Sequence, residues 1–316
     1  MTKTSSPVVI NFKVSNRSGI FSLISLLIFT TFGFSLSLSE NYALYALGQI
    51  VVFSLMWSWF SVLHTCGHQS YVKNKKINFF IGHIASLITF VPFYSWKYHH
   101  DEHHRWTGWK ENDPTVSDAP DEMPNKAVMK FLDFCWNNWI PIFSISHALT
   151  NFWNPKRMNQ ILKSDKKKKE SLFSQLFLVI YMTAFLLIAP AAYFKIFGIA
   201  MILFLVSGDI ILLSQHVHLP VYKTLGKQVK PHNDHEQFTR SIYIHPLIDR
   251  YVLLNFNLHN VHHCYPTIPH YFLHKVEFEP KNKVTLKAWI IQIKKMSVSE
   301  LFWPQDLQDK RGMQNV

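Results

Sequence analysis

Apolar residues along the chain gather in four long runs that polar segments separate. The runs cover about residues 20–38, 42–63, 172–189 and 191–213. Each approaches the roughly 20 residues that a helix needs to cross a bilayer. Because the connectors at residues 39–41 and at Pro190 are very short, the runs predict two helical hairpins and four membrane-spanning helices.

Two further stretches are apolar or aromatic but contain polar and proline positions. Residues 77–96 include Gly82, His83 and Pro92, and residues 129–153 include several polar side chains and a proline. Irregular segments are tolerated at membrane depth only where protein or water surrounds them, so we expect re-entrant or interfacial helices here. The predicted fold is an all-α integral membrane protein with two hairpins, interfacial helices and a cytosolic, histidine-rich cap.

The polar ends of the chain and its basic loops indicate an orientation. Residues 1–17 are expected to form a cytosolic tail without a removable signal peptide, because no cleavage site follows a short apolar core. Residues 18–275 form the predicted membrane domain, and residues 276–316 a second cytosolic tail. Lysines such as those at 166–169 flank the apolar runs, and lysine and arginine near span ends are retained in the cytosol.

Composition supports a membrane protein with a large polar part. Charged residues make up 16% of the chain, against about 25% in soluble domains, while the mean hydropathy is only +0.03. The net charge of +12 lies largely in loops beside the apolar runs, which favours a membrane surface over nucleic acid as the partner. The three cysteines are scattered and predict no disulfide framework.

Histidine is the unusual residue, because three tight clusters contain eight candidate metal ligands among the 18 histidines. The candidates are His64 and His68, then His100, His103 and His104, and finally His259, His262 and His263. Spacings of three and four residues place side chains on one face of a helix, where imidazoles can converge on a metal. Imidazole suits iron, zinc, copper and nickel. Eight histidines exceed the needs of one ion, which favours two metals.

A structural role is the ordinary explanation for an isolated histidine, and a single His-x-x-x-His pair also arises by chance. Two copies of His-x-x-His-His in the same chain make chance a poor explanation here. A closed zinc site would use about four ligands, and the chain contains no Cys-x-x-Cys pair. The clusters therefore predict a metal centre.

The order of these motifs resembles that of the integral-membrane fatty acid desaturase and hydroxylase superfamily. Residues 91–108, which read Val-Pro-Phe-Tyr-Ser-Trp-Lys-Tyr-His-His-Asp-Glu-His-His-Arg-Trp-Thr-Gly, are similar to the second histidine box of acyl-lipid desaturases. Residues 262–271, which end in Pro-Thr-Ile-Pro-His-Tyr, are similar to their third box. The resemblance covers roughly residues 45–275 and implies a fatty acid desaturase that holds two iron ions.

The resemblance also implies a ninth ligand at the end of the fourth apolar run. The sequence Ser214-Gln-His216-Val-His218 aligns with a Gln-His-x-His motif of similar desaturases, so His216 is the expected ligand and His218 the second choice. His99 precedes its box and is expected to pack beside it. The remaining histidines are expected to be structural: His83, His147, His232, His235, His245, His270 and His274.

Several polar residues near the clusters could hold a ligand imidazole in position. Asp209 lies seven residues before His216 and thus on the same helical face, where its carboxylate could accept a ring N–H. Hydration of Asp209 by the cytosol is the alternative. Asn260, His218 and Asp101 are further candidates for this role. Others of the same kind are Glu102, Asp113, Asp249 and Asn257.

The activity that the resemblance implies is O2-dependent desaturation of a fatty acyl chain. An unactivated methylene offers side chains neither an acidic proton nor an electrophile, so a metal cofactor must carry the reaction. Electrons are expected from a separate ferredoxin or small cytochrome, because the chain carries no flavin or nicotinamide fingerprint and no His-Pro-Gly-Gly word. The acyl group could be carried as a membrane lipid, as acyl-CoA or on a carrier protein.

Two alternative functions stay open at this point. The same boxes serve di-iron hydroxylases and ketolases that act on lipids, alkanes or carotenoids, although the residues around the boxes favour an acyl desaturase. A metal transporter fits less well, because transporters bind their substrate near the bilayer midplane, whereas these boxes lie at span ends and in polar segments. The compact size and the missing fused haem domain lead us to expect a bacterial inner membrane, with the endoplasmic reticulum as the alternative.

Overall fold

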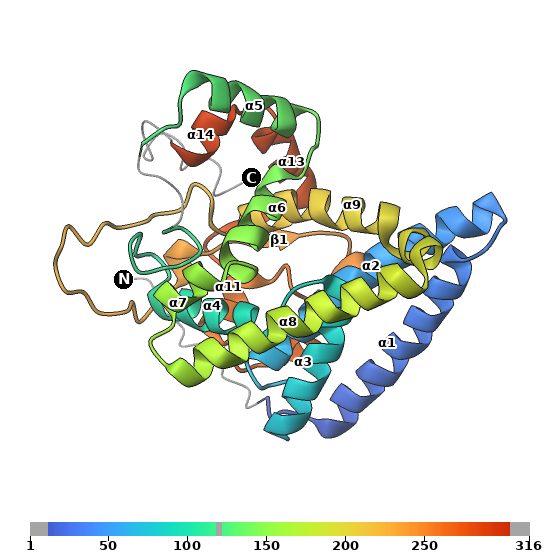
Figure 1. Ribbon diagram of the computed structural model, residues 1–316. Helices are drawn as coiled ribbons and strands as arrows, with labels where there is room; N and C mark the ends of the chain where they lie inside the picture. Colours follow the sequence, from blue (N-terminus) through green and yellow to red (C-terminus); the bar gives the residue numbers. More distant parts are fainter. Residues whose placement is uncertain (1–11, 118–121, 304–316) are drawn as a thin grey trace.

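The computed structural model describes residues 12–117 and 122–303, and its four longest helices form two hairpins (Figure 1). These helices are α1 (Asn16–Ser37), α2 (Tyr42–Gly67), α8 (Asp165–Ile188) and α9 (Pro190–His216). Within the described residues, they are the helices that are individually long and apolar enough to cross a membrane. The predicted all-α membrane fold with two hairpins is confirmed.

All four helices extend beyond the apolar runs that predicted them. For example, α8 begins at Asp165 rather than at about residue 172, and α9 ends at His216 rather than at about residue 213. Hydropathy marks the lipid-facing part of a helix, whereas backbone hydrogen bonds continue into polar turns. The added turns matter because they carry His64 and His216 on rigid helix ends.

A bent pair of helices, α3 (Lys75–Thr89) and α4 (Phe93–Trp106), replaces the interrupted stretch at residues 77–96. The two axes differ by 105°. Phe90 ends α3 with a φ of 56°, in the left-handed region, and Pro92 precedes α4, so the helix cannot continue. The bend packs α4 against α2 and α8, which brings the second histidine box beside the first.

Short elements cover the polar end of the hairpins. They are α5 (Lys126–Asn137), α6 (Ile142–His147), a π-helical turn (Ala148–Phe152), α7 (Pro155–Ile161), α10 (Pro246–Tyr251), α11 (His259–Cys264) and α12 (His270–Leu273). A 3-10 turn (Glu236–Phe238) leads into β1 (Ser241–Tyr243), which pairs in parallel with β2 (Lys283–Thr285) in the register Ser241 to Lys283. The strand pair holds α11 against the end of α9, since β1 contacts both helices.

The C-terminal part of the chain is integrated into the protein as far as residue 303. Helices α13 (Leu286–Ile293) and α14 (Val298–Phe302) pack on α5 and α9 around the fully buried Trp289, whose indole N–H donates to the carbonyl of Ile210 at 3.0 Å. Residues 276–303 of the expected cytosolic tail (276–316) thus pack against the rest of the protein, and their cytosolic location stays a prediction. Residues 304–316 lie outside the described residues, as do residues 1–11 of the expected N-terminal tail.

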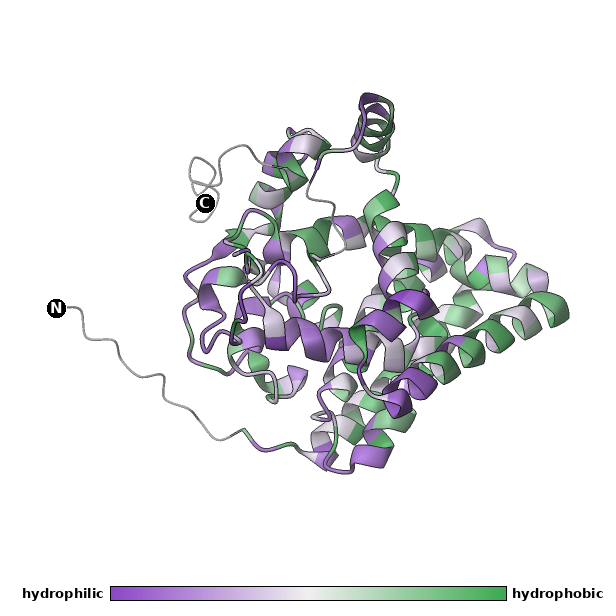
Figure 2. Ribbon diagram, turned by 60° about the vertical axis from the view of Figure 1, so that its left-hand side comes forward, coloured by the Kyte–Doolittle hydropathy of each residue, from purple (hydrophilic) through white to green (hydrophobic). Residues whose placement is uncertain are grey.

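The protein separates an apolar end from a polar end. In Figure 2 apolar residues dominate the hairpins, and polar residues gather around the short elements at the opposite end. One polar side chain at the apolar end, Gln49, is buried and fully engaged. Its amide nitrogen donates to the carbonyl of Lys195 at 2.6 Å and its oxygen accepts from the N–H of Ala200 at 3.0 Å. This clamp joins the hairpins where unpaired polar atoms would be costly.

Close packing of α1 on α2 depends on the absence of a side chain at Gly48. A Cβ there would lie 2.5 Å from the backbone nitrogen of Ser37, whereas a Cβ at Gly198 of α9 would meet nothing within 4 Å. We expect Gly48→Ala to destabilise the protein by about 1–3 kcal/mol, the usual cost of overpacking. Thermal unfolding in detergent should show a lower midpoint for this variant and no such loss for Gly198→Ala. Equal midpoints would contradict the packing argument.

Candidate metal centre

Four separate segments bring nine histidines together at the polar end of the hairpins. The end of α2 supplies two, α4 supplies three, the last residue of α9 supplies one and α11 supplies three. They are His64, His68, His100, His103, His104, His216, His259, His262 and His263. These are the nine residues that the sequence singled out, and the structure divides them into two groups.

Group 1 contains five histidines whose ligand nitrogens all lie within 4.8 Å of one another: His64, His68, His100, His104 and His262. The Nε2 atom of His104 lies 3.0 Å from Nε2 of His100 and 3.0 Å from Nε2 of His262. Group 2 contains four under the same limit: His103, His216, His259 and His263. There, Nε2 of His259 lies 2.8 Å from Nε2 of His216.

The helices α4 and α11 each serve both groups. On α4, the pair His100 and His104 faces group 1 and His103 faces group 2, while on α11 the pair His259 and His263 faces group 2 and His262 faces group 1. Residues four apart share a direction more closely than residues three apart. The groups are adjacent, because the rings of His104 and His263 stack with centroids 4.0 Å apart.

The nitrogen geometry fits metal ions. Two imidazole nitrogens that bind one ion at about 2.1 Å and at a right angle are about 3 Å apart, which is close to the three short separations above. Among the described residues, the buried Nε2 atoms of His64, His68 and His263 have no hydrogen-bond partner. Buried polar atoms are normally paired, and unpartnered nitrogens that converge are compatible with an ion between them.

Burial keeps the rings in the form that binds metal. Desolvation, followed by the neighbouring imidazoles, lowers the pKa values of His259, His262 and His263 well below their usual range. These rings are therefore uncharged at neutral pH, and a metal does not have to displace a proton from the ligating nitrogen.

Two ligand rings of group 2 are held by hydrogen bonds on their outer nitrogen. Nδ1 of His103 lies 2.9 and 3.0 Å from the carboxylate oxygens of Asp113, and Nδ1 of His216 donates to the carbonyl of Phe238 at 3.1 Å. Such partners fix the tautomer and aim Nε2 at the metal. Asp113 follows His103 by ten residues, and the sequence offered it only as one carboxylate among several.

The other residues expected to support the ligands lie elsewhere. Asp209 accepts from the backbone N–H of Ser144 on α6 at 2.5 Å, because α6 packs on that face of α9. Asp101 pairs instead with the buried Lys97 one turn earlier on α4, at 2.6 Å. Neither carboxylate holds a ligand imidazole.

His218 and Asn260 also differ from the expectation. Nε2 of His218 donates to the carbonyl of Glu300 at 2.9 Å, since the chain turns after His216 and directs this ring toward α14. The Asn260 amide donates to the carbonyls of Glu236 at 2.8 Å and Thr239 at 2.9 Å. Asn260 therefore supports a ligand indirectly, by fixing the turn whose carbonyl holds His216.

Aromatic side chains separate group 1 from the membrane-spanning core. The ring of Trp96 stacks on His100 with centroids 4.4 Å apart, and Phe256 lies 5.3 Å from His64. Phe60 contacts both Trp96 and Phe256 and continues toward Trp57 inside the hairpins. Group 1 thus borders an apolar, aromatic environment on this side.

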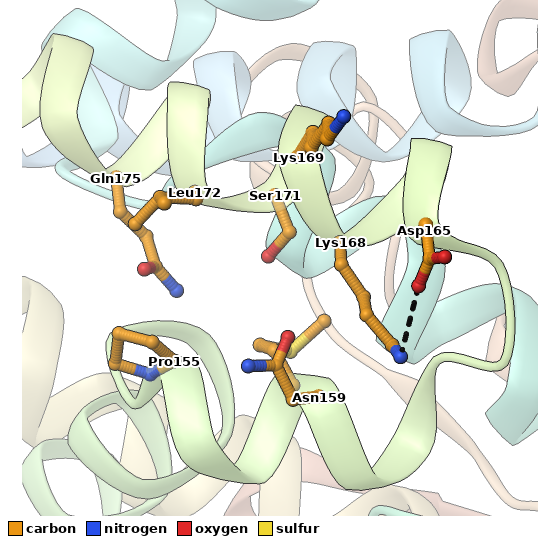
Figure 3. Close-up of a pocket in the computed structure, with 9 residues that line it drawn as sticks. Pro155, Asn159, Asp165, Lys168, Lys169, Ser171, Leu172 and Gln175 are labelled. Carbon is orange, nitrogen blue, oxygen red and sulfur yellow. Dashed lines mark hydrogen bonds and ion pairs between the residues drawn. The ribbon is translucent and has the colours of Figure 1, made fainter.

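A cavity of about 340 Å³ lies away from the histidines, between α7 and the start of α8 (Figure 3). Its lining includes Asn159, Lys168 and Gln175, and Lys168 is paired with Asp165 at 3.3 Å. None of its lining residues is a histidine, so this cavity is separate from the metal groups.

The fold and the paired histidine groups define a class, a multi-pass membrane protein with a metal site at the ends of its spanning helices. The chain belongs to the fatty acid desaturase family, whose model matches residues 40–285. The resemblance inferred from the histidine boxes is confirmed.

Individual relatives are distant. An omega-3 fatty acid desaturase of chloroplasts from Glycine max is 25% identical over 240 residues, which are 70% of this chain and 50% of that protein. An acyl-lipid omega-3 desaturase (cytochrome b5) of the endoplasmic reticulum from Arabidopsis thaliana is 26% identical over 243 residues, 70% and 59% of the two chains. An sn-1 acyl-lipid omega-3 desaturase (ferredoxin) from Nostoc sp. is 37% identical over 75 residues, 22% and 21%. The chain spans about half the length of the Glycine max relative.

The carboxylate of Asp113 should affect metal binding, and that of Asp101 should not. Asp113→Ala removes the acceptor that holds His103, so we expect metal affinity to fall by about 10–100-fold. Asp101→Ala removes the pair with the buried Lys97 but no contact to a ligand imidazole, and it serves as the comparison. Competition between the purified protein and a chelator measures both affinities. Equal affinities for the two variants would remove Asp113 from this role.

The two histidines at the end of α9 provide a second matched pair. We expect His216→Ala to lose bound metal, because its Nε2 belongs to group 2, and His218→Ala to retain it, because its ring is bonded to the backbone of Glu300. Metal per chain should be compared at equal expression. Loss confined to His218→Ala would exchange the roles, and loss in neither would exclude a ligand from α9.

Proposed function

We propose that this protein is an O2-dependent desaturase that introduces a double bond into a fatty acyl chain at a di-iron centre. The convergence of nine imidazoles in two adjacent groups carries this proposal, and membership in the fatty acid desaturase family supports it. With O2, two electrons and two protons, an iron pair would remove one hydrogen from each of two neighbouring methylene carbons and leave two waters.

The ligand assignment follows the two groups. His64, His68, His100, His104 and His262 would hold one iron, and His103, His216, His259 and His263 the other. All ligands are imidazole nitrogens, which suit iron. The carboxylate of Asp113 beside His103 adds negative charge to the second group and would favour a cation there.

The substrate proposed is an acyl chain that reaches the centre from the membrane. The aromatic side chains between the hairpins and group 1 would align its methylenes and exclude water, which limits side reactions of a strong oxidant. Relatives named as acyl-lipid desaturases favour a lipid-bound acyl group over acyl-CoA or an acyl carrier.

The electrons would come from a separate carrier in the cytosol. Relatives are named with ferredoxin or with cytochrome b5, and a ferredoxin or small cytochrome is the donor class that we propose. Exposed lysines follow the first box, with Lys73 before α3 and Lys75 and Lys76 at its start, where they could attract an acidic carrier. The same basic residues favour a cytosolic polar end, with a bacterial inner membrane as our proposal and the endoplasmic reticulum as the alternative.

Expression in a host with a defined lipid profile tests the proposed activity. We expect mass spectrometry of total fatty acids to show chains that lack one pair of hydrogens. His100→Ala and His263→Ala should abolish this product, because each removes a ligand, yet they should still insert into membranes. Hydroxylated chains in place of alkenes would contradict desaturation and favour the hydroxylase alternative. Near-normal product from either variant would remove that histidine from the ligand set.

A further inference from the structure

A tenth histidine, His235, lies beside group 2 although it belongs to no box. It precedes the 3-10 turn at Glu236–Phe238 and is half-buried. Its Nδ1 atom lies 3.4 Å from Nδ1 of His263, and the two ring centroids are 5.6 Å apart. No spacing in the sequence links His235 to the histidine boxes.

The arrangement of the other rings of group 2 gives this contact a meaning. His103 and His216 each engage a hydrogen-bond partner through Nδ1, namely the Asp113 carboxylate and the Phe238 carbonyl. His263 has the same orientation, because its Nε2 is buried without a partner among the described residues while its Nδ1 faces His235. His235 thus occupies the place that a carboxylate or a carbonyl occupies for its neighbours.

We propose that His235 is a positioning residue for His263. Its Nδ1 accepts the Nδ1–H of His263, which leaves the Nε2 lone pair of His263 directed at the metal. His235 then carries its own proton on Nε2, and its ring also hydrogen-bonds with the backbone of His232. This inference rests on the proposed metal centre and adds a residue that the family motifs do not contain.

Hydrogen bonds within the turn and from helix α11 hold the backbone around His235 in place. The carbonyl of His235 accepts from the N–H of Phe238 at 3.0 Å and from Oγ1 of Thr239 at 3.0 Å. The Asn260 amide on α11 ties the same turn down through the carbonyls of Glu236 and Thr239. One short turn therefore supplies the partners of two ligand rings, the carbonyl of Phe238 for His216 and the ring of His235 for His263.

Direct metal binding by His235 is the rival explanation, since ligand atoms of His104, His235 and His263 lie within 4.8 Å of one another. An ion shared by Nδ1 of His235 and Nδ1 of His263 would require His263 to bind metal through its outer nitrogen. The convergence of His263 with His103, His216 and His259 is instead explained by its inner Nε2. A hydrogen-bonding role therefore accounts for both nitrogens of His263.

Three variants of the full-length protein separate these explanations. His235→Ala removes the acceptor, whereas His235→Asn keeps one, because the asparagine Oδ1 is attached to Cγ as Nδ1 of histidine is. His232→Ala is the control, since His232 lies in the same loop but stacks on Trp109 at 4.8 Å. The readouts are iron per chain, affinity for Co²⁺ in competition with a chelator, and the visible spectrum of the Co²⁺-loaded protein.

Two Co²⁺ ions should bind, one more weakly than the other. We expect His235→Ala to hold the more weakly bound Co²⁺ about 10–100-fold less tightly than the unmodified protein does. His235→Asn and His232→Ala should stay close to the unmodified protein in affinity and in spectrum. The proposal is overturned if His235→Ala binds like the unmodified protein, or if His235→Asn is as weak as His235→Ala. An unmodified protein that binds no metal would overturn the proposed centre as well, whereas unaltered binding in the variants would overturn this inference alone.

Discussion

The convergence of nine imidazoles on two adjacent points is the constraint on which the rest of the structure depends. These rings come from helix ends that are far apart in the sequence, so α2, α4, α9 and α11 must meet with their histidines facing inward. Without an ion, several buried nitrogens have no partner, which is a costly state for polar atoms. Metal binding at the proposed centre would therefore be coupled to the packing of the polar end, and the free energy of binding would contribute to the stability of the fold.

The position of the centre relative to the membrane explains why the protein combines apolar hairpins with a polar cap. The ends of α2 and α9 carry ligands directly, so the rigid spans set the location of both groups. The α3–α4 bend and the β1–β2 pair add the remaining ligands from outside the hairpins. Aromatic rings such as Phe60 and Phe256 connect the two environments, which suits chemistry on an apolar chain with electrons that arrive from water.

The sequence predicted the hairpins and eight of the histidines because both leave local signals, hydropathy over about 20 residues and spacings of three or four. The ninth, His216, was expected only from the resemblance to desaturases. Which histidines of different helices share one group leaves no such local signal. It depends on how α4 crosses α11, which sends His103 to one group and His104 to the other. Asp209 was expected beside His216 from helical periodicity alone. However, α6 covers that face of α9, and the backbone N–H of Ser144 donates to the Asp209 carboxylate. The packing of the residues after 275 on α9 could not be predicted either, because Trp289 and its partner Ile210 are far apart in the sequence.

The central proposal is that the histidines form two metal sites and that both sites hold iron. Diffraction from crystals of the purified protein, with anomalous differences recorded at the iron absorption edge, tests it most directly. We expect two peaks, one among the nitrogens of His64, His68, His100, His104 and His262, and one among those of His103, His216, His259 and His263. A single peak, or a signal that appears only at the zinc edge, would contradict the account.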